Sequence, residues 1–448
     1  MDKLPSEIII TILSTLPIKS LISCRCVCKS WLNLTHDSQL ITTHLHRSSQ
    51  NEDNLSIIFV SCILINPTHF RTRLSFIDNN YGGTNDNYTC VDLNLSIPNL
   101  NKFEVLGSCN GLLCLFDPLT KTLKYICNPC NGEYAPLPNP IRPSPSSTST
   151  SSPLPLEVAV GFGYLPQSNV YKVIELVYYS SAIFSGDSRP EAHVLTLGDR
   201  SWRHIGNAPF SLIRGSKASQ AFVNGALHWL SDSPGFDCIV SFDVGEEQFG
   251  VVPHPEFESG QLNYRLGVLR GCLSAANYSY AEYAEMWVMN EYGVKESWTR
   301  YFKVNCSEVG LRIGFVRPLC RRRSDEVLLL HGSSSLLCYD PITKRLKELS
   351  IVRLPPAFQV VVLKTHSPYQ PPLAIFNPAF TASSPAKFFG SGDPSNRTSL
   401  YMLKTHSWKL RNNANRSNGA SADSSLRTQL QLQLRSGGWN RYTSELRI

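Results

Sequence analysis

"LLCLFDPLTKTLKYICNP" at residues 112–129 consists of an apolar strand, an aromatic–aspartate pair, a four-residue turn and a returning strand. Two later stretches repeat the pattern: "CIVSFDVGEEQFGVVPHP" at 238–255 and "LLCYDPITKRLKELS" at 336–350. An aspartate just before a turn caps it by accepting hydrogen bonds from the backbone N–H groups that follow. Each stretch therefore predicts a β-hairpin with a capped turn.

Two tryptophans lie between these hairpins, in "RSWRHI" and "ESWTRYF", and each enters a short strand. The steps from Trp202 to Asp243 and from Trp298 to Asp340 are 41 and 42 residues. A four-stranded propeller blade occupies roughly 40–50 residues. The spacing therefore predicts a β-propeller.

Other short apolar runs rich in β-formers support an all-β domain from about residue 51. They are "LSIIFVSCILI", "GLLCLF", "YKVIELVYY", "AHVLTL", "ALHWLS", "CIVSF", "EMWVM" and "EVLLLH". Gly, Pro, Asn and Asp turns separate them, and no helix-length pattern stands between them. In residues 51–110 the pattern of strands and turns is too weak to show where the blades begin and end.

The N-terminus has a different pattern. "SEIIITILSTL" between Pro5 and Pro17 carries Ile8, Ile9, Ile12, Leu13 and Leu16 at helical spacing, which predicts an apolar stripe. We expect Ser6 to cap this helix and Glu7 to suit its N-terminal end. A short second helix in "IKSLISC" and a third from about Cys26 to Leu34 follow. Three small helices form a core that needs a neighbour to cover it.

The stretch "SCRCVCKSW" (23–31) raises the possibility of a metal or redox site at Cys24, Cys26 and Cys28. Residues two apart on a helix lie nearly opposite each other, so three sulfurs at this spacing do not converge on one ion. We interpret these cysteines as small apolar packing residues.

"LPSEIIITILSTLPIKSLISCRCVCKSW" resembles an F-box of the plant type, from Leu4 to about Leu45. One departure is visible, because Ser23-Cys24 stands where the family often has an aromatic residue and an arginine. The resemblance implies docking onto a Skp-type adaptor and, through it, a cullin. It implies adaptor contacts from Leu4, Pro5, Ile8, Leu16, Pro17, Leu21, Val27, Cys28 and Trp31.

The β-rich part resembles the plant F-box-associated, or kelch-like, domain over about 105–350. The matching stretches are "GSCNGLLCLFD", "NP" at 128–129, "VGFGY" with "YKVIEL", "SW" at 201–202 and "FVNGALHWL". "PSPSSTSTSSPLP" (143–155) interrupts the match with the composition of a disordered loop. We expect an α+β multidomain chain: a three-helix F-box at 1–46, a propeller at 51–363, and a linker and low-complexity, disordered tail at 364–448.

Other groups that could carry chemistry have plainer interpretations. Cys109, Cys114, Cys127 and Cys130 have a spacing reminiscent of a zinc ribbon, but they flank buried-looking strands and are more simply core cysteines. His228 lies in an apolar strand and is expected to be a core histidine. The run 321–323 is a basic cluster that we expect in a solvated turn. No catalytic motif was found, and we expect neither metal nor cofactor.

Charge and composition limit the partners. The net charge is +7, and the segment from Lys409 onward carries +5 of it, so the body of the chain is a poor candidate for nucleic-acid binding. We see neither a secretory signal nor an apolar run long enough for a membrane helix, which predicts a cytoplasmic or nuclear protein.

These features together predict a non-catalytic substrate-recognition subunit of an SCF-type ubiquitin ligase, which brings an unknown protein close to the ubiquitin-charged enzyme. The alternative is a propeller-type glycan- or small-molecule-binding protein or enzyme with an incidental helical leader. An aberrant gene product also stays open, because the C-terminal composition is unusual.

Overall fold

The computed structural model of the chain describes the residues of the propeller and part of the N-terminal module. The described ranges are 5–16, 27–35, 55–66, 69–78, 88–93, 101–129, 132–140, 155–179, 189–212, 221–231, 239–257, 264–278, 283–305, 316–322, 325–332 and 334–364. Twelve single positions are also described: Leu21, Cys24, Asp37, Gln39, Leu40, Thr43, His44, Arg47, Leu95, Ile97, Leu100 and Ala218. The expected tail beyond 364 and residues 143–154 of the expected loop lie outside these ranges.

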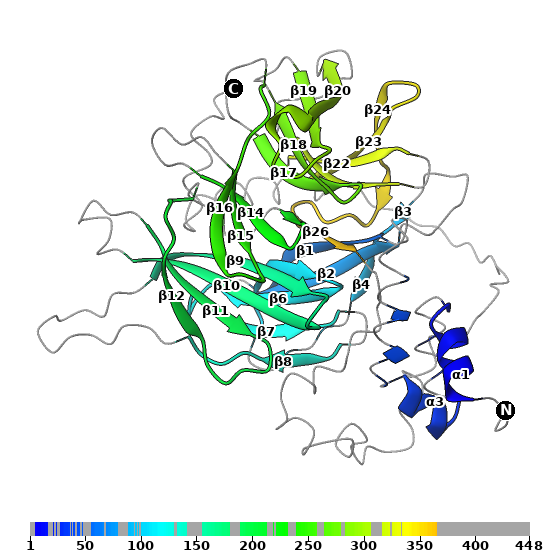
Figure 1. The fold of residues 1–448 in the computed structure, drawn as a ribbon. Helices are drawn as coiled ribbons and strands as arrows, with labels where there is room; N and C mark the ends of the chain where they lie inside the picture. The colour runs from blue at the N-terminus through cyan, green and yellow to red at the C-terminus, as the bar shows by residue number, and fades with distance from the viewer. Residues whose placement is uncertain are drawn as a thin grey trace, which may run out of the picture. The chain divides into compact units, whose positions relative to one another are not determined.

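The described residues form six four-stranded antiparallel sheets, the blades of a β-propeller (Figure 1). Blade 1 contains β26 (Gln359–Lys364), β1 (Leu55–Asn66), β2 (His69–Asp78) and β4 (Val91–Leu93). Blade 2 contains β5 (Glu104–Cys109), β6 (Leu112–Asp117), β7 (Thr122–Cys127) and β8 (Tyr134–Pro136). Blade 3 contains β9 (Pro155–Leu165), β10 (Val170–Tyr179), β11 (Glu191–Thr196) and β12 (Arg203–Asn207).

The second half continues the pattern. Blade 4 contains β13 (Ala221–Val223), β14 (Ala226–Leu230), β15 (Ile239–Asp243) and β16 (Gln248–Val252). Blade 5 contains β17 (Tyr264–Leu269), β18 (Cys272–Tyr278), β19 (Tyr283–Met289) and β20 (Trp298–Asn305), with the short 3-10 helix η1 (Lys295–Ser297) before β20. Blade 6 contains β21 (Val316–Arg321), β22 (Val327–His331), β23 (Ser335–Asp340) and β24 (Arg345–Glu348). A parallel pair, β3 (Tyr88–Thr89) and β25 (Ile351–Val352), accompanies them.

Each of the eight apolar runs singled out in the sequence is found in a strand. The middle strands of a blade are buried on both faces because the blade is packed between two others, so these strands appear as continuous apolar runs. Strand β6 shows this, with Leu112 to Phe116 all buried. Pro155 begins β9, so the expected disordered loop of 143–155 was one residue too long at its end.

Six separate apolar clusters hold the blades together, one for each pair of neighbours. Blades 1 and 2 share the cluster containing Leu113, blades 2 and 3 that containing Tyr171, and blades 3 and 4 that containing Trp229. Blades 4 and 5 meet around Trp298, blades 5 and 6 around Phe302, and blades 6 and 1 around Phe59. The last cluster closes the ring.

The "VGFGY" motif is explained by one of these contacts. A Cβ atom on Gly161 would lie 2.6 Å from Leu227 Cδ1 and 2.9 Å from the ring of Trp229. Strand β9 can therefore approach blade 4 closely only because this position has no side chain.

The three predicted hairpin caps are confirmed. Asp117 Oδ1 accepts from the backbone N–H of Leu119 at 2.9 Å, and Asp340 Oδ1 accepts from that of Ile342 at 2.9 Å. Asp243 Oδ1 accepts from Gly245 and Glu246, each at 2.8 Å. The last turn residue has positive φ in every case: Lys121, Glu247 and Lys344, at 52°, 56° and 55°.

The hairpins do not occupy equivalent places in their blades. The Asp117 turn joins the second and third strands of blade 2, whereas those of Asp243 and Asp340 join the third and fourth strands of blades 4 and 6. The 41 or 42 residues between each tryptophan and the next aspartate therefore do not make up one blade. They begin at the outer strand of one blade and end at the third strand of the next.

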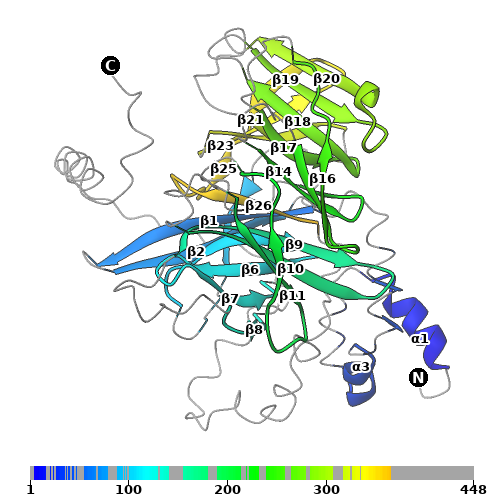
Figure 2. The ribbon, with the colours of Figure 1, turned by 60° about the vertical axis from the view of Figure 1, so that its left-hand side comes forward.

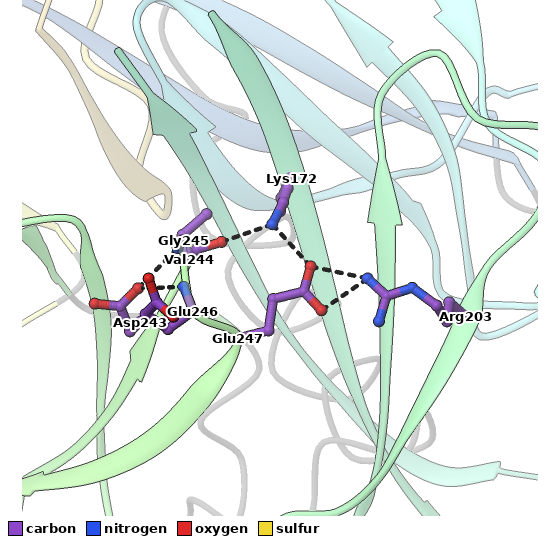
Figure 3. A network of polar contacts seen from close by, with 7 residues as sticks. All are labelled: Lys172, Arg203, Asp243, Val244, Gly245, Glu246 and Glu247. Carbon is purple, nitrogen blue, oxygen red and sulfur yellow. Dashed lines mark hydrogen bonds and ion pairs between the residues drawn. The ribbon is translucent and has the colours of Figure 1, made fainter. Parts of the chain in front are cut away.

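Polar contacts also join the β15–β16 hairpin of blade 4 to blade 3 (Figure 3). Glu247 Oε1 accepts from Lys172 Nζ at 2.8 Å, and both Glu247 oxygens accept from Arg203 Nη2, at 2.8 and 2.7 Å. Lys172 also donates to the Val244 carbonyl at 3.0 Å. Partial burial raises the pKa of Glu247, but the hydrogen bonds and positive charges of Lys172 and Arg203 outweigh it and lower the pKa. The carboxylate thus stays ionised and ties two blades.

The two repeated tryptophans act as matching clamps between blades. Trp202 Nε1 donates to the Pro138 carbonyl at 2.8 Å, and Trp298 Nε1 donates to that of Pro253 at 2.9 Å. Each proline follows the outer strand of the preceding blade. Each tryptophan is nearly buried, at 4% and 7% exposed.

We expect Trp202→Phe and Trp298→Phe each to lower the free energy of unfolding by about 0.5–1.5 kcal/mol beyond the lost packing, because a part-buried carbonyl loses its donor. Urea denaturation measures this. Trp229→Phe is the control, since its indole N–H is buried without a hydrogen-bond partner in the described part of the chain. Equal losses at all three positions would show that the clamps add nothing.

The first blade is built from both ends of the domain. Strand β26 pairs antiparallel with β1, from Leu55–Lys364 to Val60–Gln359. We expect a chain ending at residue 358 to lose cooperative thermal unfolding, because β1 is left with an unpaired inner edge and two apolar cores are opened.

A chain ending at residue 410 is the control for this truncation. Its melting temperature should stay close to that of the full chain, since the removed segment is too polar to contribute a core. Similar melting of the two truncated chains would contradict the closing role of β26.

Candidate functional site

The N-terminal module packs a small core of its own. Helix α1 (Ser6–Leu13) contributes Ile10 and Leu13 to it, and these residues meet Leu21, Cys24 and Leu40. Four half-buried side chains pack against this core: Ile9, Leu16, Trp31 and Leu34. The core is small because only five side chains in the described part of the module are both apolar and buried.

The expected apolar stripe of α1 was partly wrong. Leu13 is buried, but Ile8 and Ile12 are 46% and 50% exposed, and Ile10, outside the expected stripe, is buried instead. The helix carries isoleucines on two sides, so periodicity alone could not tell which side faces the core. Ser6 is the first helical residue rather than the cap, and Pro5 takes the capping position without a side-chain bond. Glu7 lies in the first turn as expected.

Helix α3 (Lys29–Leu34) begins later than the expected Cys26. Cys28 is its N-cap, with extended backbone, and its Sγ accepts from the Trp31 backbone N–H at 3.5 Å. Cys28 therefore fixes the start of the helix and does not share a helical face with Trp31. The Trp31 side chain is half-buried against the core.

Four large apolar side chains of this module remain on its surface. They are Ile8 and Ile12 on α1, Val27 just before α3 and Leu32 on it, at 46%, 50%, 63% and 38% exposed. We call this set the exposed apolar set. These four residues lie on or next to two helices of one small module and are not used in its core.

The predicted contact residues fall into four groups. Leu4 and Pro17 lie outside the described residues. Pro5, Ile8, Val27 and Cys28 are exposed, and Leu16 and Trp31 are half-buried. Leu21 is fully buried in the core, so it supports a surface from beneath and cannot contact a partner in this structure. Ile12 and Leu32 are also exposed and were not among the predicted contacts, although the i, i+4 spacing of Ile8 and Ile12 places those two on one side of the helix.

The end of the module is tied back to α1. His44 Nε2 lies 3.0 Å from the Leu16 carbonyl, and Arg47 Nη1 donates to Ser14 Oγ at 2.7 Å. Burial lowers the pKa of His44; the hydrogen bond to Leu16 raises it, and the charge of Arg47 lowers it. The net shift is downward, which favours neutral His44 with Nε2 protonated as the donor to Leu16. The expected count of three helices stays a prediction, since only α1 and α3 have bounds within the described residues.

The cysteines lie in different surroundings. Cys24 is 7% exposed in the module's core, where burial raises its pKa, whereas Cys28 is exposed. Cys26 and Cys130 lie outside the described residues. Cys109, Cys114 and Cys127 are buried in the propeller core, which confirms their interpretation as core cysteines.

His228 and the basic run also find structural roles. His228 is fully buried, and its Nε2 lies 2.8 Å from the Tyr292 hydroxyl. Burial lowers the pKa of His228 to about 4, although two hydrogen bonds with the backbone act to raise it. It is the core histidine that the sequence predicted. Arg321 ends β21, and Arg322 pairs with Glu326 at 2.9 Å and donates to the Tyr88 hydroxyl, so these two arginines are structural rather than solvated. Arg323 lies outside the described residues.

Comparison with known proteins agrees with this organisation. An F-box-like family model matches residues 1–47, and a model of the F-box associated beta propeller domain matches residues 68–360. F-box protein At3g07870 of Arabidopsis thaliana is 30% identical over 400 residues, which cover 81% of this chain and 91% of that protein. F-box protein CPR1 (28%; 80% and 87% covered) and F-box/kelch-repeat protein At3g23880 (29%; 75% and 87% covered), from the same plant, are also similar.

The chain thus combines a small helical module with a six-bladed propeller, which is a two-domain organisation. The chain belongs to the F-box proteins that carry an F-box associated beta propeller domain. In the part that the structure describes, no helix has the length and apolar character needed to span a membrane.

Proposed function

We propose that this chain is the substrate-recognition subunit of an SCF-type ubiquitin ligase. Its F-box binds a Skp-type adaptor and so joins a cullin, and its propeller binds the protein to be ubiquitinated. The observation that carries this proposal is the exposed apolar set on a module too small to use those side chains in its own core. The family membership supports it.

The proposed role is non-catalytic. A receptor that holds its target beside a ubiquitin-charged enzyme raises the effective concentration of the reacting groups and needs no nucleophile of its own. Such a subunit would act in the cytoplasm or the nucleus, where these ligases work. The target is set by the surface of the propeller, where loops can change without disturbing the six interblade cores.

Deleting residues 1–46 should abolish co-precipitation of the Skp-type adaptor and of cullin while leaving the propeller folded. Co-precipitation from plant cells with the proteasome blocked, together with a thermal melt of the purified truncated chain, measures both. Adaptor recruitment by the truncated chain would place the docking module elsewhere. A full chain that never recruits adaptor, yet binds a glycan or small molecule, would favour the alternative function.

Trp31→Ala should weaken adaptor binding at least tenfold, since aromatic anchors commonly contribute about 2 kcal/mol or more when they are truncated. Cys24→Ser should change it little, because Cys24 lies in the core and not on the surface. Isothermal titration with purified adaptor measures both affinities.

Because Trp31 also packs against the core, Ile8→Glu provides a surface variant. It should weaken the adaptor strongly and leave the melting temperature nearly unchanged. Equal losses for Trp31→Ala and Cys24→Ser, with Ile8→Glu neutral, would show that stability and not contact governs binding.

A further inference from the structure

Two histidines and a glutamate gather at the outer edge of blade 3. Glu191 and His193 are on β11, and His204 is on β12, the outermost strand of the blade (Figure 1). One ligand atom from each residue lies within 4.8 Å of the other two. His193 Nε2 is 4.0 Å from Glu191 Oε2, and the two imidazole centroids are 5.1 Å apart.

The backbone explains why these side chains share one face. Glu191 and His193 are two residues apart on a strand and so point the same way. His204 is the direct cross-strand partner of His193. Neighbouring side chains across antiparallel strands have Cβ atoms about 4.5–5.5 Å apart, which is within reach of one ion.

A β-bulge sets this partnership. Ala192 pairs with Gly206, but His193 pairs with His204, so Ile205 is an extra residue in β12. Gly206 has φ of 102°, as such an irregularity favours. With regular pairing, Ile205 would lie opposite His193. The bulge instead lets Ile205 pack against the core between blades 3 and 4 and places His204 beside His193.

We propose that Glu191, His193 and His204 bind one Zn²⁺ ion. Two imidazoles and one carboxylate are a donor set that zinc takes with three protein ligands and an open fourth position. Imidazole donors disfavour Mg²⁺ and Ca²⁺, which prefer oxygen ligands alone. This site revises the expectation of no metal, which rested on the cysteine spacings and on the absence of a recognised motif.

The burial of the three ligands suits such a site. His193 is 6% exposed, the Glu191 side chain is 33% exposed, and His204 is exposed. One ligand is therefore held by the interior, and two lie toward solvent, where an ion can enter. Ligand atoms around zinc stand roughly 3.3 Å apart when each bond is about 2.0–2.1 Å, so the exposed imidazole and the carboxylate would close inward on binding.

The strand behind His193 carries a carboxylate as well. Glu175 on β10 is paired with His193 in the register of β10 and β11, and it is fully buried. Histidines that bind metals usually have a carboxylate or carbonyl beyond the ring, which orients it and raises its basicity. The row Glu175, His193, His204 thus runs from the interior of the blade to its edge. A bound ion would fasten β12 to β11 and leave one coordination position open to water or to a donor from a partner.

The test uses the full chain, stripped with a chelator and titrated with Zn²⁺ in a calorimeter, with metal content measured by mass spectrometry. We expect one zinc per chain and a higher melting temperature with zinc. His204→Ala and Glu191→Gln should each weaken zinc binding at least tenfold. His254→Ala, a half-buried histidine on the loop after β16, should bind as the native chain does.

One further variant and one control measurement keep the outcome decisive. Cys127→Ser should retain the zinc, which separates this site from a thiolate site. Melting of the variants in chelator should match the native chain, because His204 and Glu191 are not core residues. No stoichiometric zinc in the native chain, zinc unaffected by both ligand variants, or zinc lost with Cys127→Ser would each overturn the proposal.

Discussion

The pairing of β26 with β1 is the interaction on which the propeller depends. Alternate side chains of β26 fill the two cores beside it: Val360 packs between blades 6 and 1, and Val361 between blades 1 and 2. The same strand makes two side-chain hydrogen bonds to its neighbours. Arg317 Nη2 donates to the Val360 carbonyl at 3.1 Å, and Gln359 Nε2 donates to the Val105 carbonyl at 2.7 Å. Six residues thus join blades 6, 1 and 2 through backbone pairing, apolar contact and hydrogen bonds (Figure 2).

Much of the propeller could be predicted from local sequence, because the capped hairpins and doubly buried strands have short-range signals. Asp117, Asp243 and Asp340 cap their turns as their spacing indicated. The first blade could not be predicted this way, since β26 pairs with a strand some 300 residues earlier and no local pattern records that partnership. The Trp–Asp spacing gave nearly the right period, although each step crosses from one blade into the next.

The candidate sites show the same division between local and long-range information. The resemblance to an F-box predicts contacts from Ile8, Val27 and Trp31, and that stays a prediction. Helix α1 is apolar on two sides, so only packing could show that Ile10 is buried and Ile12 exposed. The proposed zinc ligands could not be predicted from the sequence for another reason. His193 and His204 are 11 residues apart and become partners only because a bulge at Ile205 shifts the register by one residue.

The closing strand also sets the order in which the protein can be completed during synthesis. Strand β1 leaves the ribosome early, whereas β26 follows only after blades 2 to 6 have been translated. At about 5–20 residues per second, the inner edge of β1 waits roughly 15–60 s for its partner. An open strand edge of this kind is prone to pair with other chains. A newly made molecule should therefore depend on chaperones until residue 364 emerges, and a ribosome stalled before that point would release a chain prone to aggregation.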